Sequence, residues 1–263
     1  QAMMKERIVK REDLIITTKV WRSFWHNPAK SVDISLKELQ LEYVDLVLQH
    51  WPICLHGDEN GLPPIPKDDE GNILYDDDPR TGKKFIDVYH ALEDLVETPK
   101  VKSVGVSNYS LPKIKELLPA VKKHVPVVNQ IEYHPQLPQQ DLVSFCEKHG
   151  ILITAYSPVG SGGAPVLKLP LVQQLAEKYN VSVNEIATAY HVLNGRITIP
   201  RSSNLERIRT TTRLVHLTKE ELSELYQIGE KNPKRHINDP WGYGLGFQWW
   251  QGNSDDLKFH VVS

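Results

Sequence analysis

Short apolar runs of strand length alternate along the chain with longer segments whose apolar residues recur every three or four positions. The short runs are rich in β-branched residues, which is typical of strands buried on both faces of a parallel sheet. They predict six strands, at Leu14–Thr18, Val44–Leu48, Val101–Ser107, Val127–Glu132, Ile151–Tyr156 and Ile197–Pro200. Strict alternation of strand and helix predicts an α/β fold with a parallel sheet.

The segments between these runs predict the helices. Their ranges are Pro28–Leu39, Phe85–Val96, Pro112–Leu118, Gln139–His149, Lys168–Tyr179, Val183–Asn194, a helix starting near Asn204, and Thr218 to about Ile228. Local start signals support two of them. Asn27 before Pro28 is typical of an N-cap, and Thr218 with Glu221 matches a capping box.

Two stretches have no periodicity. The stretch His56–Lys84 is rich in Pro, Gly and Asp, which indicates either a functional loop or disorder. Its acidic clusters at 68–70 and 76–78 lack the spacing of a calcium loop and are expected to be solvated surface. The tail from Asn232 is expected to be irregular.

Composition narrows the function classes. A length of 263 residues with 40% apolar residues suits a single domain covering 1–263. A net charge of −2 gives no electrostatic case for nucleic acid, and no apolar stretch is long enough to span a membrane. The two cysteines, Cys54 and Cys146, are far apart, so we expect no metal site and a reducing, cytoplasmic location.

The start of the chain and the strand count together suggest an incomplete barrel. Residues 1–6 read as the last turns of a helix already under way, and a (β/α) barrel closes with eight strands rather than six. We therefore expect that the first two βα units are absent from this chain. Because an unclosed barrel has two open strand edges, we expect the chain to be poorly stable unless another segment or chain fills the gap. We expect the protein to be a monomer or a weak dimer.

Polar residues follow the predicted strands at the points where the strands end. They are Lys19, His50, Ser107 with Asn108, Gln130, Tyr156 with Ser157, and Arg201. His50 alone is equally well explained as a hydrogen-bonded strand end. In a barrel, however, all these ends converge on one mouth, so the collection predicts a site.

The residue types indicate what this site would bind. Asn108 and Gln130 offer amides suited to a neutral carboxamide, and Tyr156 offers a flat face for an aromatic ring. Glycines at 160, 162 and 163 permit close backbone approach, while Arg201 and Arg207 supply positive charge near a helix start. Together they favour a nicotinamide at one end and phosphates at the other.

At this point the chain resembles the aldo-keto reductase family along essentially its whole length. The matching motifs, in order, are the Thr18-Lys19 strand end, LQHWP at 48–52, GVSN at 105–108, NQIEYHP at 129–135, YSPVGS at 156–161 and IPRS at 199–202. The resemblance implies a (β/α)8 TIM barrel that binds extended NADPH or NADP+ without a Rossmann fold. Within the family, the chain resembles fungal glycerol, glyceraldehyde or xylose reductases.

The resemblance also implies roles, residue by residue. Ser107, Asn108 and Gln130 would hold the carboxamide, and Tyr156 would stack on the nicotinamide. The pyrophosphate would be wrapped by Ser157, Pro158, Val159 and Ser161. The adenosine side, including its 2′-phosphate, would be held by Ile199, Pro200, Arg201, Ser202, Ser203 and Arg207. His134 matches a family position that we interpret as structural.

For catalysis, the family passes a hydride to a carbonyl carbon while a tyrosine hydroxyl protonates the oxygen. Lys19 matches the lysine that makes this tyrosine a usable acid, and His50 the histidine that orients the carbonyl. Trp21, Trp51 and Trp250 would wall the substrate, with 232–263 as the substrate loop. The family's Tyr and its partner Asp lie upstream of Gln1.

Two further positions depart from the family pattern. Arg201 replaces the usual lysine, which keeps the charge. Thr210 and Thr211 stand where many members carry Glu and Asn against adenine, which weakens the expectation of tight cofactor binding.

Three functions follow as hypotheses. The leading one is an NADPH-dependent carbonyl reductase or polyol dehydrogenase acting on a small carbonyl or polyol. The second is a cofactor-binding barrel without turnover, with a regulatory or interaction role. The third is a Schiff-base aldolase that uses Lys19.

Overall fold

The computed structural model describes residues 1–58, 60–250 and 260–262. The chain divides into two compact units. Unit 1 comprises Gln1–Val128, Gly244–Gly246 and the described residues of Asn253–Ser263, and unit 2 comprises Asn129–Tyr243 and the described residues of Phe247–Gly252. Each unit is described by itself below.

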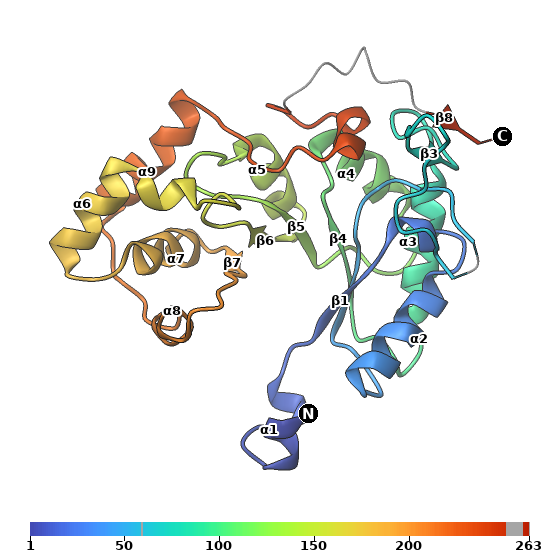
Figure 1. The fold of residues 1–263 in the computed structure, drawn as a ribbon, viewed down its shortest axis with the longest axis horizontal. Coiled ribbons are helices and arrows are strands. Elements are labelled where there is room, and N and C mark those ends of the chain that lie inside the picture. The colour runs from blue at the N-terminus through green and yellow to red at the C-terminus, as the bar shows by residue number, and fades with distance from the viewer. Residues whose placement is uncertain (59, 251–259, 263) are drawn as a thin grey trace. The chain divides into compact units, whose positions relative to one another are not determined.

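Unit 1 is built on three parallel strands in the order β1-β2-β4 (Figure 1). Their ranges are β1 (Thr17–Val20), β2 (Leu46–Gln49) and β4 (Val104–Ser107). Lys19 pairs in register with Leu48, and Leu48 with Gly105. The His50 N–H donates to the Val20 carbonyl at 3.1 Å, so β1 and β2 end at the same edge.

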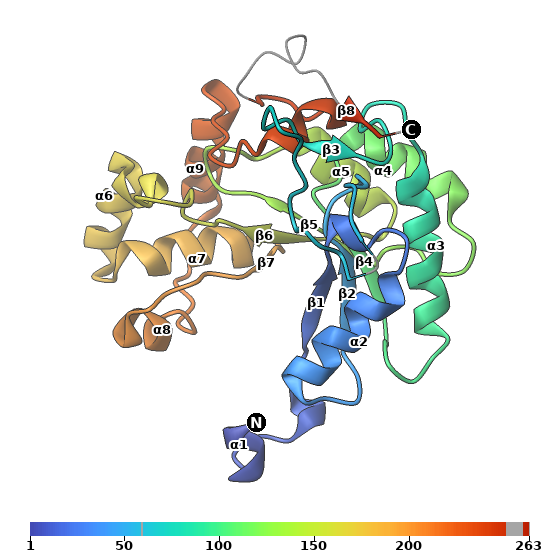
Figure 2. The ribbon, with the colours of Figure 1, turned by 45° about the vertical axis from the view of Figure 1, so that its right-hand side comes forward.

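Two helices pack beside these strands, α2 (Pro28–Leu39) and α3 (Lys84–Val96) (Figure 2). The helix α2 begins as predicted, because the Asn27 side chain accepts from the Lys30 N–H at 3.2 Å. The helix α3 buries the predicted apolar stripe, of which Phe85, Val88, Tyr89 and Leu92 are each at most 3% exposed. This burial is what removes the helix's apolar face from water.

The remaining elements of unit 1 are short. They are α1 (Ala2–Lys5), α4 (Leu111–Leu117), the 3-10 helices η1 (Arg11–Asp13), η2 (Arg22–Phe24) and η3 (Leu118–Ala120), and a separate parallel pair of β3 (Leu74–Tyr75) with β8 (His260–Val261).

Unit 2 has three further strands, in the order β5-β6-β7. Their ranges are β5 (Val128–Glu132), β6 (Leu152–Tyr156) and β7 (Ile197–Thr198), and Ala155 pairs in parallel register with Thr198. The helices are α5 (Gln140–Lys148), α6 (Pro170–Tyr179), α7 (Val183–Leu193), α8 (Leu205–Thr210) and α9 (Lys219–Lys231), with the 3-10 helix η4 (Pro165–Lys168). The 3-10 helix η5 (Pro240–Leu245) has residues in both units.

The helices of unit 2 start where their caps predict. Thr218 and Glu221 form the predicted reciprocal capping box of α9, and Asn204 caps α8 with its side chain. Gly150 follows α5 at φ 72°, a left-handed conformation in which glycine avoids the cost that a side chain would bring. The helix α7 runs against β7 (Figure 2).

Several predicted boundaries were wrong. The first strand is displaced from 14–18 to Thr17–Val20, because its register is set by pairing with β2, and Ile15 is 84% exposed. The stretch 56–84 contains β3 and is not featureless. Its Asp76–Asp78 cluster is also not merely solvated, since Asp76 accepts from Trp25 Nε1 at 2.8 Å and Asp77 from the Lys84 N–H at 2.7 Å.

The tail was also more ordered than predicted. It forms η5 and contributes β8, whose neighbour Val262 donates its N–H to the Tyr75 carbonyl at 2.8 Å. Both elements depend on partners distant in sequence, which a local pattern does not reveal.

Candidate active site

In unit 1 the ends of β1 and β2 bring together His50 and the predicted wall Trp21. Their ring centroids are 5.0 Å apart with the planes at 75°. Trp51, directly after His50, is 4% exposed. The Trp21 indole N–H donates to the Pro64 carbonyl at 2.6 Å, which fixes the ring against the loop.

Burial changes the acid-base properties of both predicted catalytic residues. It lowers the pKa of Lys19 to about 8, because the ammonium form loses hydration. It also lowers the pKa of His50 to about 3, with the positive charges of Lys19 and Arg22 adding to the effect. His50 is therefore neutral at physiological pH, while Lys19 is mostly charged and can lose its proton in mildly alkaline solution.

Arg22 is a site residue that the sequence did not single out. Its side chain is 2% exposed, and its guanidinium carbon lies 3.9 Å from the ring centroid of Trp21 and 5.7 Å from that of Trp51. Such stacking lets a planar cation lie among aromatic rings. A buried arginine directly after a strand is too rare for a pattern to predict.

The end of β4 carries Ser107 and Asn108, both buried. Asn108 adopts a left-handed conformation with φ 59°. Its Nδ2 donates to the His50 carbonyl at 3.0 Å, and lies 3.2 Å from the Ser107 hydroxyl. The predicted carboxamide ligands of unit 1 thus lie at the same strand edge as His50.

In unit 2, Gln130 lies within β5 rather than at its end and is 5% exposed. Tyr156 is the last residue of β6, and burial raises the pKa of its hydroxyl well above the usual range. The phenol therefore stays protonated and is a weak acid. Tyr156 is suited to stacking its ring face on a ligand and not to donating a proton in a reaction.

The turn after β6 has an unusual backbone. Ser157, Ser161 and Ala164 have φ values of 48°, 64° and 46°, and Gly160 has φ 84°. A Cβ on Gly160 would lie 2.7 Å from Pro165 Cγ and 3.0 Å from His236 Cδ2, so glycine is required there. Such strain persists where a site needs a particular backbone shape.

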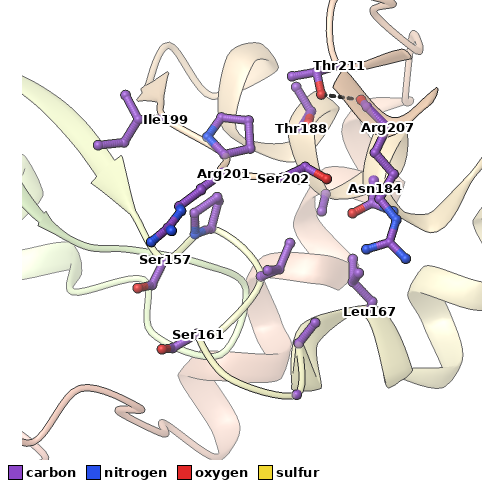
Figure 3. A pocket seen from close by; sticks show the side chains of 16 residues that line it. Ser157, Ser161, Leu167, Asn184, Thr188, Ile199, Arg201, Ser202, Arg207 and Thr211 are labelled. Atoms are coloured by element: carbon purple, nitrogen blue, oxygen red, sulfur yellow. Dashed lines mark hydrogen bonds between the residues drawn. The ribbon is translucent and has the colours of Figure 1, made fainter. Parts of the chain in front are cut away.

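This turn forms one wall of a cavity of about 600 Å³ within unit 2 (Figure 3). That volume falls in the range of small-molecule and cofactor sites. Its lining includes nine of the predicted cofactor residues, namely Ser157, Pro158, Val159, Ser161, Ile199, Pro200, Arg201, Ser202 and Arg207. Ser203 does not line it, and Gln130 and Tyr156 are not part of its wall.

The cavity carries positive charge. Arg201 and Arg207 both line it, and none of its 16 lining residues is acidic. In Figure 3 the Arg207 side chain points toward Asn184 and Leu167, and that of Arg201 toward Ser157. The first turn of α8 is capped by Asn204, whose Oδ1 accepts from the Arg207 N–H at 3.0 Å. The side-chain guanidinium groups are therefore the groups suited to an anion.

The lining also contains residues that the sequence did not indicate. Asn184, Ala187 and Thr188 line the cavity from one face of α7, with Ala164 and Leu167 beside them. Their spacing of three and four places them on one side of a helix. That spacing was the available signal, but an Asn-Ala-Thr face is common on helices that bind nothing.

The tail carries the third predicted wall, Trp250. Its ring stacks on Phe247 at a centroid distance of 5.3 Å, within unit 2. His134, interpreted as structural, is fully buried and shares a hydrogen bond with Glu132 at 3.0 Å.

Two searches of the described residues were negative. No cluster of three or more His, Cys, Asp or Glu side chains there could hold a metal ion. None of the helices in that part of the chain is long and apolar enough to cross a membrane.

Comparison with known proteins agrees with the motifs. Residues 1–230 match the model of the aldo/keto reductase family. The chain is 37% identical over 243 residues to a glycerol 2-dehydrogenase (NADP(+)) of Saccharomyces cerevisiae, covering 90% of this chain and 77% of that protein. It is also 37% identical over 248 residues to a D-galacturonate reductase of Hypocrea jecorina, covering 91% and 77%.

A solved structure gives the same answer for the fold. The aldose reductase from Schistosoma japonicum superposes with a TM-score of 0.82 at 28% identity, over 95% of this chain and 78% of that one. This agreement confirms the predicted barrel-type α/β class. The chain belongs to the aldo/keto reductase family and is an oxidoreductase of that family.

Proposed function

We propose that the protein reduces aldehyde or ketone carbonyls to alcohols with NADPH, or oxidises polyols with NADP+ in the reverse direction. The observation that carries the proposal is the positively charged cavity beside the left-handed turn that follows β6. The relative from Saccharomyces cerevisiae is named as an NADP(+) enzyme, which supports the choice of cofactor.

The cavity fits the phosphate-bearing half of this dinucleotide. Arg201 and Arg207 would bind the 2′-phosphate, with Ser202 donating a hydroxyl hydrogen bond and Ser203 nearby in sequence. The turn of Ser157–Ser161 would wrap the pyrophosphate. The absence of carboxylates among the lining residues favours an anion over a neutral ligand.

The nicotinamide half would be held by the strand ends. In unit 1, Ser107 and Asn108 have groups suited to the carboxamide. In unit 2, Gln130 offers a further amide, and Tyr156 offers a face on which the nicotinamide ring would stack. These groups are buried or half-buried, so their hydrogen bonds would form away from competing water.

The reduced nicotinamide, when bound, supplies the hydride. His50, neutral because burial lowers its pKa to about 3, would donate a hydrogen bond to the carbonyl oxygen and so orient it. The Lys19 ammonium would stabilise the negative charge that develops on that oxygen and then give it the proton that completes the alcohol. Trp21 and Trp51 would exclude water and hold a small carbonyl or polyol.

The test is NADPH oxidation by the purified chain with glyceraldehyde, followed by the loss of reduced-nicotinamide absorbance. We expect turnover that depends on aldehyde, and its loss in Lys19→Met and His50→Gln while NADPH binding persists. Binding without turnover would favour a regulatory cofactor-binding barrel instead. Borohydride trapping of an aldehyde on Lys19 would point to amine chemistry at that residue.

We also propose that the protein works in a reducing compartment, the cytoplasm. Cys54 and Cys146 are free and buried, and burial raises the pKa of both thiols. Neither therefore presents a reactive thiolate. Imaging of the tagged protein in its own cells would test the location.

A further inference from the structure

Unit 2 contains a second cavity, of about 300 Å³, that the proposed reaction does not use. It is formed by the start of α5, the last turns of α9 and two residues of the tail, and its lining is Pro138, Gln139, Gln140, Asp141, Tyr226, Gly229, Glu230, Gln248 and Trp249. None of these residues lines the larger cavity beside Arg201. The volume lies at the small end of the range for small-molecule sites.

The backbone around this second cavity is closely packed. A Cβ on Gly229 would overlap Pro138 Cδ and the Pro135 carbonyl oxygen, so α9 rests directly on the segment that precedes α5. The Lys234 N–H, which follows α9, donates to the Gln136 carbonyl at 2.8 Å. Because these contacts join the two helical walls, the cavity does not require a ligand to form it.

The lining of the second cavity is negatively charged. Asp141 and Glu230 are its two carboxylates, and none of its nine residues is Lys, Arg or His. Lys231, next to Glu230, instead donates from Nζ to Gln227 Oε1 at 3.1 Å. Burial raises the pKa of the Tyr226 hydroxyl, and the charges of Glu230 and Asp141 add to this effect, so both carboxylates act on the same phenol.

The helix ends at this cavity do not reverse its charge. The last turn of α9 favours a cation, whereas the start of α5 favours an anion. These partial charges oppose each other, and Asp141 itself lies in the first turn of α5. The two full charges of Asp141 and Glu230 therefore determine that the ligand is a cation.

Aromatic rings complete the second cavity. The Trp249 side chain is 42% exposed, and the half-buried Tyr226 adds a second ring to the lining. Aromatic faces attract cations, the indole most strongly, and they also pack against apolar carbon chains. No cluster of three or more potential metal ligands occurs among the described residues, so the lining is better suited to an organic cation than to a metal ion.

We propose that this second cavity binds a small aliphatic diamine, with its two ammonium groups on Asp141 and Glu230 and its methylene chain against Trp249. Each primary ammonium group donates charge-assisted hydrogen bonds to a carboxylate, which a quaternary ammonium ion cannot do. A monoamine leaves one of the two carboxylates without a partner. The site is separate from the proposed reductase chemistry, because the two cavities share no lining residue.

Calorimetric titration of the purified chain with putrescine (1,4-diaminobutane) at low, fixed ionic strength tests the proposal. We expect one site per chain with a Kd of about 1 mM or lower. Butylamine and tetramethylammonium should each bind at least about tenfold more weakly, because neither can engage both carboxylates through N–H groups. No saturable binding of putrescine, or equal affinity for butylamine, would overturn the inference.

Variants of the two carboxylates locate the binding. Asp141→Asn and Glu230→Gln remove one charge each with little change of shape, and each should raise the putrescine Kd at least about tenfold. The matched control is Glu224→Gln, an exposed carboxylate of α9 outside the cavity, which should leave the Kd within about twofold. Equal weakening in all three variants would mean that general surface charge attracts the amine, which contradicts a built site.

A second readout reports on the aromatic wall. Putrescine should change the fluorescence of Trp249, obtained as the difference between the chain and its Trp249→Phe counterpart. The same difference should vanish in the chain that carries both Asp141→Asn and Glu230→Gln. A putrescine response that is identical with and without Trp249, or that persists when both carboxylates are gone, would refute the proposed arrangement.

Discussion

The Asn108 side chain donates from Nδ2 to the His50 carbonyl oxygen at 3.0 Å, which ties the end of β4 to the end of β2 in unit 1. Asn108 also holds a left-handed backbone at φ 59°, a conformation that Asn tolerates better than most residues. The residue proposed to hold a carboxamide therefore also fixes the strand ends around the proposed catalytic histidine.

The variant Asn108→Asp tests this hydrogen bond. The carboxylate keeps the shape and tolerates the backbone conformation, but it cannot donate to the His50 carbonyl and is buried against it. We expect the free energy of unfolding to fall by about 1–3 kcal/mol. Urea unfolding measures it, with Asn60→Asp on the surface as a control. A variant as stable as the wild type would show that the hydrogen bond contributes nothing.

The arginines of the cavity should determine the choice between NADPH and NADH. Arg207→Gln removes a charge-assisted contact to the 2′-phosphate, so the Kd for NADPH should rise at least about tenfold while that for NADH stays nearly constant. Arg201→Gln should act in the same direction. Fluorescence titration measures both constants.

The control for this prediction lies on the same helix. Arg209 belongs to α8 but does not line the cavity, and its side chain is 77% exposed. Arg209→Gln should leave both constants unchanged. If all three variants weakened NADPH equally, general surface charge rather than the cavity would explain the binding.

Lys19 should make the reaction sensitive to alkaline pH. Its pKa of about 8 means that the ammonium loses its proton as the pH rises through that value, so kcat/KM should fall above about pH 8. Lys19→Met should lose about 10²–10⁴ in rate and show no such alkaline limb. Steady-state rates across the alkaline range, in wild type and variant, check both statements.

The same lysine has a cost in stability. Because the folded state depresses its pKa below the unfolded value, the unfolded chain binds more protons between about pH 8 and 10.5, and stability rises with pH there. Below pH 8 Lys19 is charged in the folded state, so burial of its ammonium lowers the free energy of unfolding by the full amount. Lys19→Met should therefore raise the free energy of unfolding at pH 7 by about 1–3 kcal/mol, and a destabilised variant would contradict this.

A buried histidine outside the proposed catalytic groups should make the fold sensitive to acid. Burial lowers the pKa of His191 from 6.5 to about 3, and its Nε2 donates to the Pro158 carbonyl at 3.4 Å. The unfolded chain takes up the proton first, so stability is lost as the pH falls below 6.5. His191→Gln keeps a donor and should reduce this slope by about 1.4 kcal/mol per pH unit.

Urea unfolding at several pH values between 6.5 and 5 provides the measurement, since few carboxyl groups titrate there. The exposed His216→Gln should keep the wild-type slope. An unchanged slope in His191→Gln would mean that this ring is not buried in the neutral form.

Elements with strong local signals were predictable from the sequence. The cap of Asn27 with Pro28 and the capping box of Thr218 with Glu221 fix their helices within a few residues, so α2 and α9 begin where predicted. The strand ends bearing His50 and Asn108 followed from apolar runs that stop abruptly. The first strand was misplaced because Leu14–Thr18 is β-branched, whereas pairing with β2 selects Thr17–Val20.

The parts that sequence reasoning missed depend on tertiary contacts. Arg22 is one of them, because nothing local shows that Trp51 from another segment will lie beside it. Asn184 and Thr188 lie on an ordinary helix face. The number of domains stays a prediction, and so do the individual roles of the proposed site residues.

Titration of the purified chain with NADPH and with NADH by calorimetry tests the central claim most directly. The account predicts one NADPH site per chain, clear preference over NADH, displacement by 2′,5′-ADP, and weakening in Arg207→Gln but not in Arg209→Gln. No heat of binding with NADPH, or equal affinity for both nucleotides that ignores Arg207, would contradict it.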